Sequence, residues 1–257
     1  MAKESDGFVR AIARGFSVIE ALGRPPGRHM LSEIAVASGL TRATARRVLA
    51  TLVALNYCEA DGRYFRLRPR SLGLGLSYLT ALPFWGPAQQ TLEELRNEIG
   101  ESCALAVLDG TDIVYVLRLP ARRILTTNLG IGSRLPAHVV SLGRVLLAGL
   151  SKGERDIQLS KIKFTRLTPR TIVDRSVLEK ELERVAAQGY VWIDGELDPS
   201  ICGISVPLRD NSRSVVAAIS VSLISGTIDE ATAKERYFIL LKRAAEEIRA
   251  QTATFRT

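Results

Sequence analysis

Residues 31–67 read LSEIAVASGLTRATARRVLATLVALNYCEADGRYFRL, a pattern that predicts two helices joined by a tight turn and followed by a two-stranded hairpin. Gly39 favours an end to the first helix, because glycine accepts the left-handed backbone that a sharp turn requires. Thr41 can cap the second helix, in which apolar residues recur at helical spacing. The dipeptide Asp61-Gly62 is typical of a hairpin turn.

Cationic residues gather at the start of the second helix and along the hairpin. Together these elements are typical of a winged helix-turn-helix, whose second helix enters the DNA major groove and reads base edges there. The alternative is a helical hairpin whose arginines only keep the surface hydrated. It would require a cap, a glycine turn, a cationic helix start and a basic hairpin to coincide. We therefore expect DNA contacts from Arg42, Ala43, Thr44, Arg46, Arg47, Arg63 and Arg66.

The charge is uneven along the 257 residues, a length that favours two domains. Of the chain's 35 Lys and Arg and 27 Asp and Glu, 12 and 6 lie in residues 1–82, so net formal charges of +6 and +2 fall on the two parts. A basic first part favours a polyanionic partner. No apolar signal core opens the chain and no stretch reaches the roughly 18 apolar residues of a spanning helix. We therefore expect a cytoplasmic protein with no membrane partner.

Metal, cofactor and catalytic residues are not expected. Cys58, Cys103 and Cys202 form no C-x-x-C pair, and His29 and His138 are the only histidines. This pattern offers neither a disulfide framework nor a zinc site. The glycines near residue 130 lack the context of a nucleotide-binding fingerprint.

The rest of the chain predicts an apolar helix and then an α+β domain. Leu72, Leu76 and Leu79 share one helical face in residues 69–82, and such a stripe favours packing against a second copy. Helices that bracket hairpin-connected strands are typical of an α+β domain with an antiparallel sheet. The expected helices cover residues 8–22, 89–99, 138–150, 151–159, 174–188 and 231–252, and the expected strands cover 103–108, 113–119, 122–129, 190–193, 201–208 and 214–222.

Two features of the second part favour a small anionic ligand. Arg134 and His138 lie near the expected start of the helix over 138–150, where free amides and the helix dipole favour an anion. An arginine fork also matches a carboxylate. The alternative is that Arg134 forms a structural salt bridge and His138 caps the helix. The run AAISVSL places Ser220 and Ser222 on one face of a strand, where they either line a pocket or lie in solvent.

Five stretches resemble the IclR family of bacterial transcription regulators, and more narrowly its branch that controls aromatic-acid catabolism. They are FVRAIARGFSVIEAL, LSEIAVASGLTRATARRVLATLVALNY, DGRYFRLRPRSLGLG, SRLPAHVVSLGRVLLAGL and CGISVPLRD. The resemblance implies a winged helix-turn-helix domain over residues 1–68, a linker helix over 69–82, and an effector-binding and oligomerisation domain over 83–257 with a GAF-like curved antiparallel sheet. It also implies homodimers or homotetramers on palindromic promoter sites in double-stranded DNA.

The same resemblance implies an effector pocket between the loop before the central helix and the late strands. Several relatives have a cysteine where Gly203 falls, whereas here Cys202 is its neighbour. The branch makes protocatechuate, p-hydroxybenzoate and β-ketoadipate the first candidate effectors. The implied contacts are Arg134, Leu135, His138 and Ser141 on one side, and Asp194, Gly203, Ser220 and Ser222 on the other.

Two other classes of protein share parts of this pattern. An enzyme acting on a small acid would use the second domain, although two histidines and the absence of a G-x-S-x-G elbow leave few catalytic groups. A non-specific DNA-binding protein would share the basic part but has no evident use for a second domain of near-neutral charge. We therefore expect a ligand-responsive, sequence-specific regulator and not an enzyme.

Overall fold

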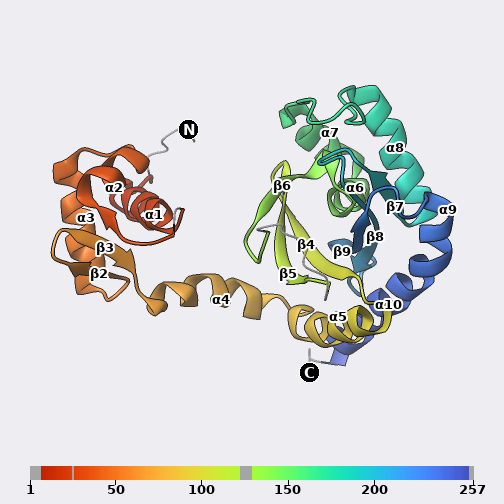
Figure 1. The fold of residues 1–257 in the computed structure, drawn as a ribbon, viewed down its shortest axis with the longest axis horizontal. Coiled ribbons are helices and arrows are strands. Elements are labelled where there is room, and N and C mark those ends of the chain that lie inside the picture. Colours follow the sequence, from red (N-terminus) through yellow and green to blue (C-terminus); the bar gives the residue numbers. More distant parts are fainter. Residues whose placement is uncertain (1–6, 25, 122–128, 255–257) are drawn as a thin grey trace. The chain divides into compact units, whose positions relative to one another are not determined.

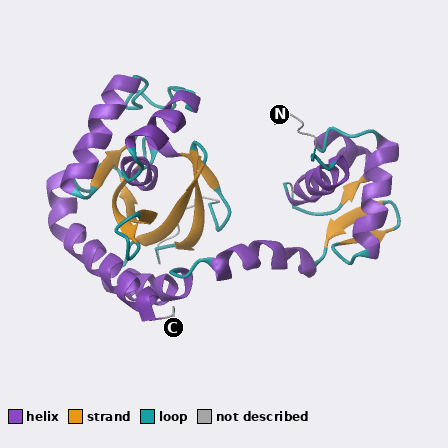
Figure 2. Cartoon of the chain, turned by 180° about the vertical axis from the view of Figure 1, so that it is seen from behind, coloured by secondary structure: helices purple, strands orange, loops and turns teal. Residues whose placement is uncertain are grey.

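The computed structural model describes residues 7–24, 26–121 and 129–254 (Figures 1 and 2). Contacts within the chain divide it into two compact units, residues 1–81 and 82–257. Apart from Leu129, the strand expected over residues 122–129 lies outside the described residues.

The described residues before Pro69 form three helices and a small antiparallel sheet, and the predicted winged helix-turn-helix is confirmed. The strand order is β1-β3-β2, and the hairpin pairs Cys58 with Leu67 and Asp61 with Tyr64. Its elements are α1 (Arg10–Gly23), β1 (His29–Met30), α2 (Leu31–Ala37), α3 (Arg42–Ala54), β2 (Cys58–Asp61) and β3 (Tyr64–Leu67).

Local signals explain where these helices start and stop. Gly39 adopts a φ of 67°, as the turn between α2 and α3 requires. The Thr41 hydroxyl caps α3 by accepting a 3.2 Å hydrogen bond from the Thr44 amide. Ile34 and Leu49 are buried in the core that joins α2 and α3. The turn and its cap therefore hold the start of α3 in place.

A short 3-10 turn (Pro69–Ser71) leads into α4 (Leu72–Ala81). The bounds of this helix are close to those expected for the helix over residues 69–82. No residue of α4 is buried. Leu72, Leu74 and Leu76 are exposed instead and Leu79 is half-buried, although the helix is strongly apolar.

The second unit contains a six-stranded antiparallel sheet in the order β6-β5-β4-β9-β8-β7, and the α+β class with a curved sheet is confirmed. Figure 1 shows that the sheet curls around α6. Small residues on β4, β8 and β9, namely Ala104, Ala106, Gly203 and Ala218, project little from the face that packs against α6. The strands are β4 (Ser102–Asp109), β5 (Asp112–Leu119), β6 (Arg134–Pro136), β7 (Val191–Asp194), β8 (Ile201–Arg209) and β9 (Val215–Ile224).

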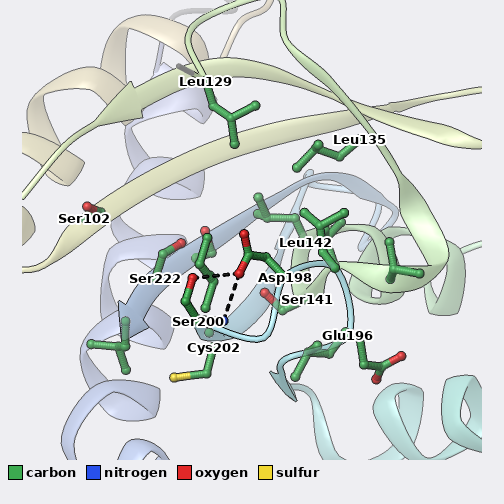
Figure 3. Close-up of a pocket in the computed structure, with 18 of the residues that line it drawn as sticks. Ser102, Leu129, Leu135, Ser141, Leu142, Glu196, Asp198, Ser200, Cys202 and Ser222 are labelled. Atoms are coloured by element: carbon green, nitrogen blue, oxygen red, sulfur yellow. Dashed lines mark hydrogen bonds between the residues drawn. The ribbon is translucent and has the colours of Figure 1, made fainter. Parts of the chain in front are cut away.

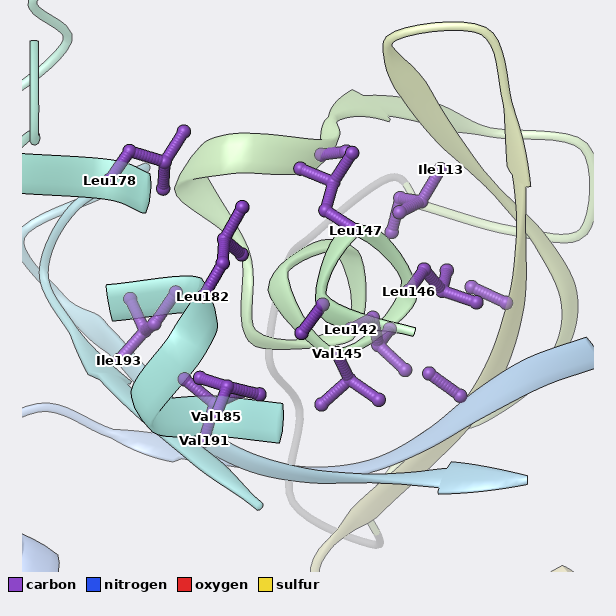
Figure 4. Close-up of a cluster of buried hydrophobic side chains, with 14 of the residues drawn as sticks. Ile113, Leu142, Val145, Leu146, Leu147, Leu178, Leu182, Val185, Val191 and Ile193 are labelled. Carbon is purple, nitrogen blue, oxygen red and sulfur yellow. The ribbon is translucent and has the colours of Figure 1, made fainter. Parts of the chain in front are cut away.

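Helices cover both faces of this sheet. In the concavity, Val145 and Leu146 of α6 pack with Leu182 of α8 and Ile193 of β7 in one buried apolar cluster (Figure 4). Helices α5 and α10 pack against each other, and α10 packs against β8 and β9. The helices are α5 (Trp85–Ile99), α6 (Ser141–Ala148), α7 (Lys152–Lys161), α8 (Arg175–Gln188), α9 (Glu230–Ala233) and α10 (Ile239–Thr254), with a 3-10 turn (Ala137–Val139) before α6 and a π-helical turn (Lys234–Phe238) before α10.

Some predicted boundaries are wrong, for identifiable reasons. Helix α5 begins at Trp85 and not near residue 89, because Pro87 falls in the first turn, where its missing amide costs no helical hydrogen bond. The helix expected from His138 begins at Ser141, and Arg134 lies in β6 rather than at a helix start. None of the described helices is long and apolar enough to cross a membrane.

Candidate functional site

The exposed end of α3 presents a cationic surface in the first unit. Arg42, Arg46 and Arg47 are exposed, whereas Ala45 and Leu49 of the same helix are buried and fix its orientation. Ala43 is exposed beside the three arginines, and Thr44 is half-buried against the Thr41 hydroxyl. No ion pair is recorded for these arginines within the described residues. The helix therefore offers three cations to an anionic partner.

The two predicted wing arginines differ from each other. Arg63 is exposed and its guanidinium lies 5.2 Å from the centre of the Tyr64 ring. Arg66 forms an ion pair with Glu59, the residue directly opposite it on β2. Arg66 is thus partly neutralised on its own hairpin, whereas Arg63 projects its charge outward.

The second unit holds a cavity of about 330 Å³ between α6, the concave sheet face and the loop before β8 (Figure 3). This volume falls in the range of small-molecule sites, which are mostly apolar with a few placed polar groups. The apolar part comes from Leu129, Leu135, Val140, Leu142 and Ile193. The polar part comes from Ser102, Tyr115, Arg118, Ser141, Glu196, Asp198, Ser200, Cys202, Ser220 and Ser222.

Five of the eight predicted effector contacts line this cavity: Leu135, Ser141, Gly203, Ser220 and Ser222. Ser141 is the first residue of α6, and its hydroxyl accepts a 2.7 Å hydrogen bond from Ser205. A Cβ at Gly203 would lie 3.4 Å from the Ser141 hydroxyl and 3.0 Å from a backbone oxygen of β9. The glycine therefore leaves room in the wall that a side chain would occupy.

Arg134 is not among the described residues that line the cavity. Its guanidinium lies 2.6 Å from Asp109 and 3.2 Å from Asp112, the two carboxylates of the β4–β5 turn. The pairing of β5 with β6 brings Arg134 to that turn. The alternative of a structural salt bridge therefore describes its position, and the expectation that Arg134 faces a ligand at a helix start is corrected.

His138 and Asp194 also lie outside the described cavity lining. The His138 ring is 4% exposed and meets the edge of Phe164 at 5.5 Å between ring centres. Burial, and then the charge of Arg144, lower the pKa of His138. Asp194 forms an ion pair with Arg170 and accepts a 2.5 Å hydrogen bond from Ser225. Asp194 therefore already has partners within the protein, whereas neither ring nitrogen of His138 has a hydrogen-bond partner among the described residues.

Sequence reasoning missed the ionisable groups of the cavity. Arg118 and Tyr115 of β5 line it, with the guanidinium 5.3 Å from the ring centre. Burial raises the pKa of Tyr115, so its phenol stays neutral. Burial also raises the pKa of Cys202 to about 11, which keeps a thiol and not a thiolate in the wall. The sequence signal for Arg118 is the alternation of side chains along β5. Only the register of β5 with β4 shows which face of the sheet Arg118 lies on.

A buried ion pair holds the loop that forms one wall. Arg144 of α6 is 2% exposed and donates to Glu196 at 2.5 Å and to the His138 carbonyl at 2.9 Å. Glu196 also accepts from the Ile172 amide at 3.1 Å, and Thr168 donates to the Gly195 carbonyl at 2.6 Å. The Glu196 carboxylate, which lines the cavity, therefore already accepts hydrogen bonds from the protein, and these bonds hold this wall of the cavity in place.

The cavity is equipped to hold a ligand by shape, hydroxyls and one arginine. Asp198, at its edge, accepts hydrogen bonds of 2.8 and 2.7 Å from the amide and hydroxyl of Ser200, a local turn contact that lowers the pKa of Asp198 (Figure 3). Among the described residues, no group of three or more His, Cys, Asp or Glu side chains could hold a metal ion.

Comparison with known proteins covers nearly the whole chain. The family model described as "Bacterial transcriptional regulator IclR C-terminal" matches residues 76–250, and that described as "IclR helix-turn-helix domain" matches 11–62. The chain is 33% identical to the Pca regulon regulatory protein of Pseudomonas putida, over 94% of this chain and 83% of that protein. It is 29% identical to the p-hydroxybenzoate hydroxylase transcriptional activator of Acinetobacter baylyi, over 95% and 92% of the two chains.

Solved structures are similar over the same extent. A chain from Rhodococcus sp. RHA1 has a TM-score of 0.86 and 41% identity, over 96% of this chain and 100% of that one. An IclR homologue from Microbacterium hydrocarbonoxydans, solved with 4-hydroxybenzoate, has a TM-score of 0.84 and 27% identity, over 95% and 99%.

Proposed function

The chain belongs to the IclR family of bacterial transcriptional regulators, and we propose that it controls genes of aromatic-acid catabolism in response to a small organic acid. In this proposal residues 1–68 bind promoter DNA, residues 69–82 link the two domains, and residues 83–257 bind the acid and contribute to oligomerisation. The protein then acts in the cytoplasm, where promoter DNA is found.

DNA recognition is assigned to the start of α3 and to the wing. Arg42, Arg46 and Arg47 are exposed on a helix whose opposite face is packed in the core, as a major-groove helix requires. Ala43 and Thr44 complete the face that meets the bases, and Arg63 and Arg66 of the wing contact the backbone. Phosphate contacts position such a domain and base contacts specify its sequence.

The cavity in the second unit is the observation that carries the effector assignment. It combines apolar walls with an arginine and several hydroxyls, the groups that would orient a small acid. The names of the relatives favour aromatic acids and their catabolites. The first candidates are p-hydroxybenzoate, protocatechuate and β-ketoadipate.

Exposed apolar faces support assembly into homodimers or homotetramers. Helix α1 exposes Ile12 and Phe16, and α4 exposes Leu72, Leu76 and Tyr78. Faces of this kind are covered in stable assemblies. A two-fold assembly of helix-turn-helix domains binds a palindromic site, because each half-site meets one recognition helix.

An acid can change transcription only if it binds one arrangement of the assembly better than another. The test is a gel-shift titration of the full-length protein on DNA from the promoter regions that flank its own gene, with and without each candidate acid. We expect one acid to change the operator affinity by about 5- to 150-fold, the usual range of allosteric coupling. Unchanged affinity with every acid that binds the protein would refute the proposed response. A turnover assay with the same acids tests the enzyme alternative.

A further inference from the structure

Arg118 and Ser220 lie on one row across the concave face of the sheet. The register pairs Arg118 of β5 with Ala104 of β4, and Ala104 with Ser220 of β9. Residues directly opposite each other in antiparallel strands project from the same face. Two strand spacings separate the backbones of Arg118 and Ser220 by about 10 Å. Only the Ala104 methyl lies between the cation and the hydroxyl along this row.

Ser220 supplies a hydroxyl that no other described group engages. It is 1% exposed, it lines the cavity, and its Oγ has no hydrogen-bond partner within the described residues. Its cross-strand neighbour Ser205 donates to Ser141 instead. A buried hydroxyl is costly when unpaired, so this end of the cavity favours a ligand with an uncharged hydrogen-bonding group.

Arg118 supplies the opposite polar end. Its guanidinium is half-buried over the Tyr115 ring, an arrangement that restrains the side chain within the cavity wall. A guanidinium matches the two oxygens of a carboxylate. The walls between the two ends are apolar, with Leu129, Leu135 and Leu142 among them.

Resting on the proposed function, we propose that the effector is an aromatic monocarboxylic acid with a hydroxyl at its far end, whose carboxylate binds Arg118 and whose hydroxyl binds Ser220. A flat ring fits between the apolar walls, and its length separates the two polar groups. A linear dicarboxylic acid is disfavoured. Its second carboxylate would be buried at the Ser220 end, where no described lining residue carries a positive charge.

Isothermal titration of the full-length protein with four probes tests this assignment: 4-hydroxybenzoate, benzoate, phenol and adipate. Benzoate lacks the hydroxyl, phenol lacks the carboxylate, and adipate carries two carboxylates without a ring. We expect 4-hydroxybenzoate to bind most tightly. Tighter binding of adipate would overturn the preference for a monocarboxylic acid.

Two variants identify which end binds which group. Arg118→Gln should weaken 4-hydroxybenzoate and benzoate by the same factor, about 10- to 100-fold, as expected for a charged hydrogen bond, and should leave phenol unchanged. Ser220→Ala should weaken 4-hydroxybenzoate by about 3- to 10-fold, as expected for a neutral hydrogen bond, and should leave benzoate unchanged. Arg134→Gln is the control, because it removes the same charge from the same unit outside the cavity.

The proposed orientation is refuted by the opposite pattern, in which Ser220→Ala weakens the binding of benzoate and Arg118→Gln does not. Equal losses for all probes would indicate a folding defect, which unliganded melting curves detect independently. Because Ser220→Ala removes an unpaired buried hydroxyl, its melting temperature should not fall. If the wild-type protein binds none of the aromatic probes, the proposed aromatic effector itself is refuted, together with this assignment.

Discussion

The buried Arg144–Glu196 pair gives the sharpest prediction of stability. Arg144→Met would leave the Glu196 carboxylate in the wall without its cation, while the Ile172 amide still donates to it. Breaking a buried pair on one side costs about 3–5 kcal/mol, because the remaining charge stays desolvated. For a domain of this size that loss lowers the melting temperature of the second unit by about 6–20 °C.

A double-mutant cycle tests this prediction. Its second change is Glu196→Gln, which removes the negative charge but keeps an acceptor for the Ile172 amide. The double variant Arg144→Met/Glu196→Gln leaves neither charge unpaired, so it should recover a large part of the loss. We expect a coupling free energy of about 0.5–3 kcal/mol between the two sites. Arg243→Met is the surface control, since its pair with Glu98 is exposed and should contribute about 0–1 kcal/mol.

Urea unfolding followed by tryptophan fluorescence measures this cycle in the full-length protein. The chain has two tryptophans, Trp85 and Trp192, and both belong to the second unit. The signal therefore reports that unit without interference from the DNA-binding domain. Single variants whose losses simply add, or an Arg144→Met loss no larger than that of the surface control, would refute the claim that this pair holds the wall.

Three further predictions test other parts of the structure. Arg46→Ala and Arg47→Ala should each weaken specific operator binding by about 1–3 kcal/mol in gel shifts while leaving acid binding unchanged; equal loss of both would contradict separate sites. The lowered pKa of His138 means that the unfolded chain binds the proton more tightly, so the free energy of unfolding measured with urea should fall as the pH drops below about 6.5. His138→Phe should make this free energy depend less on pH. Gly143→Ala would place a Cβ 2.1 Å from a backbone oxygen and should cost about 1–3 kcal/mol or more, whereas Gly153→Ala meets nothing within 4 Å and should not destabilise; similar melting curves would refute the close approach.

The predictions that succeeded rest on signals within a few residues of one another. Gly39 and Thr41 mark the turn between α2 and α3, and Asp174 caps α8 by accepting from the amides of Ser176 and Val177. Short-range hydrogen bonds decide such features, so the sequence carries them directly. The sequence from Thr227 to Glu230 also matches a capping box and predicts a helix start at Thr227, but this prediction is wrong, because Asp229 caps α9 by accepting a hydrogen bond from the Thr232 amide.

The cavity depends on long-range pairing, which explains why it was only partly predicted. Alternation in β9 places Ser220 and Ser222 on one face, but only the curl of the sheet around α6 makes that face concave. Arg118 joins the same face through its register with β4, and a β-bulge at Leu105/Ala106 shifts that register within the same strand pair. An interrupted alternation cannot be read from residues 112–119 alone.

Arg134 and Arg118 illustrate what distinguishes an arginine in a structural ion pair from the arginine that we propose binds the ligand. Arg134 meets two carboxylates of its own chain, Asp109 and Asp112, so a ligand carboxylate would have to displace an ion pair that is already formed. Arg118 lies over the Tyr115 ring in the cavity wall, where a ligand carboxylate can reach its guanidinium. Both arginines belong to strands and both are followed by Leu-Pro, so their local sequences look alike. The difference lies in where the sheet places the two side chains, Arg134 at the β4–β5 turn and Arg118 in the cavity wall, and for this reason charge-removing substitutions at the two positions should affect ligand binding differently.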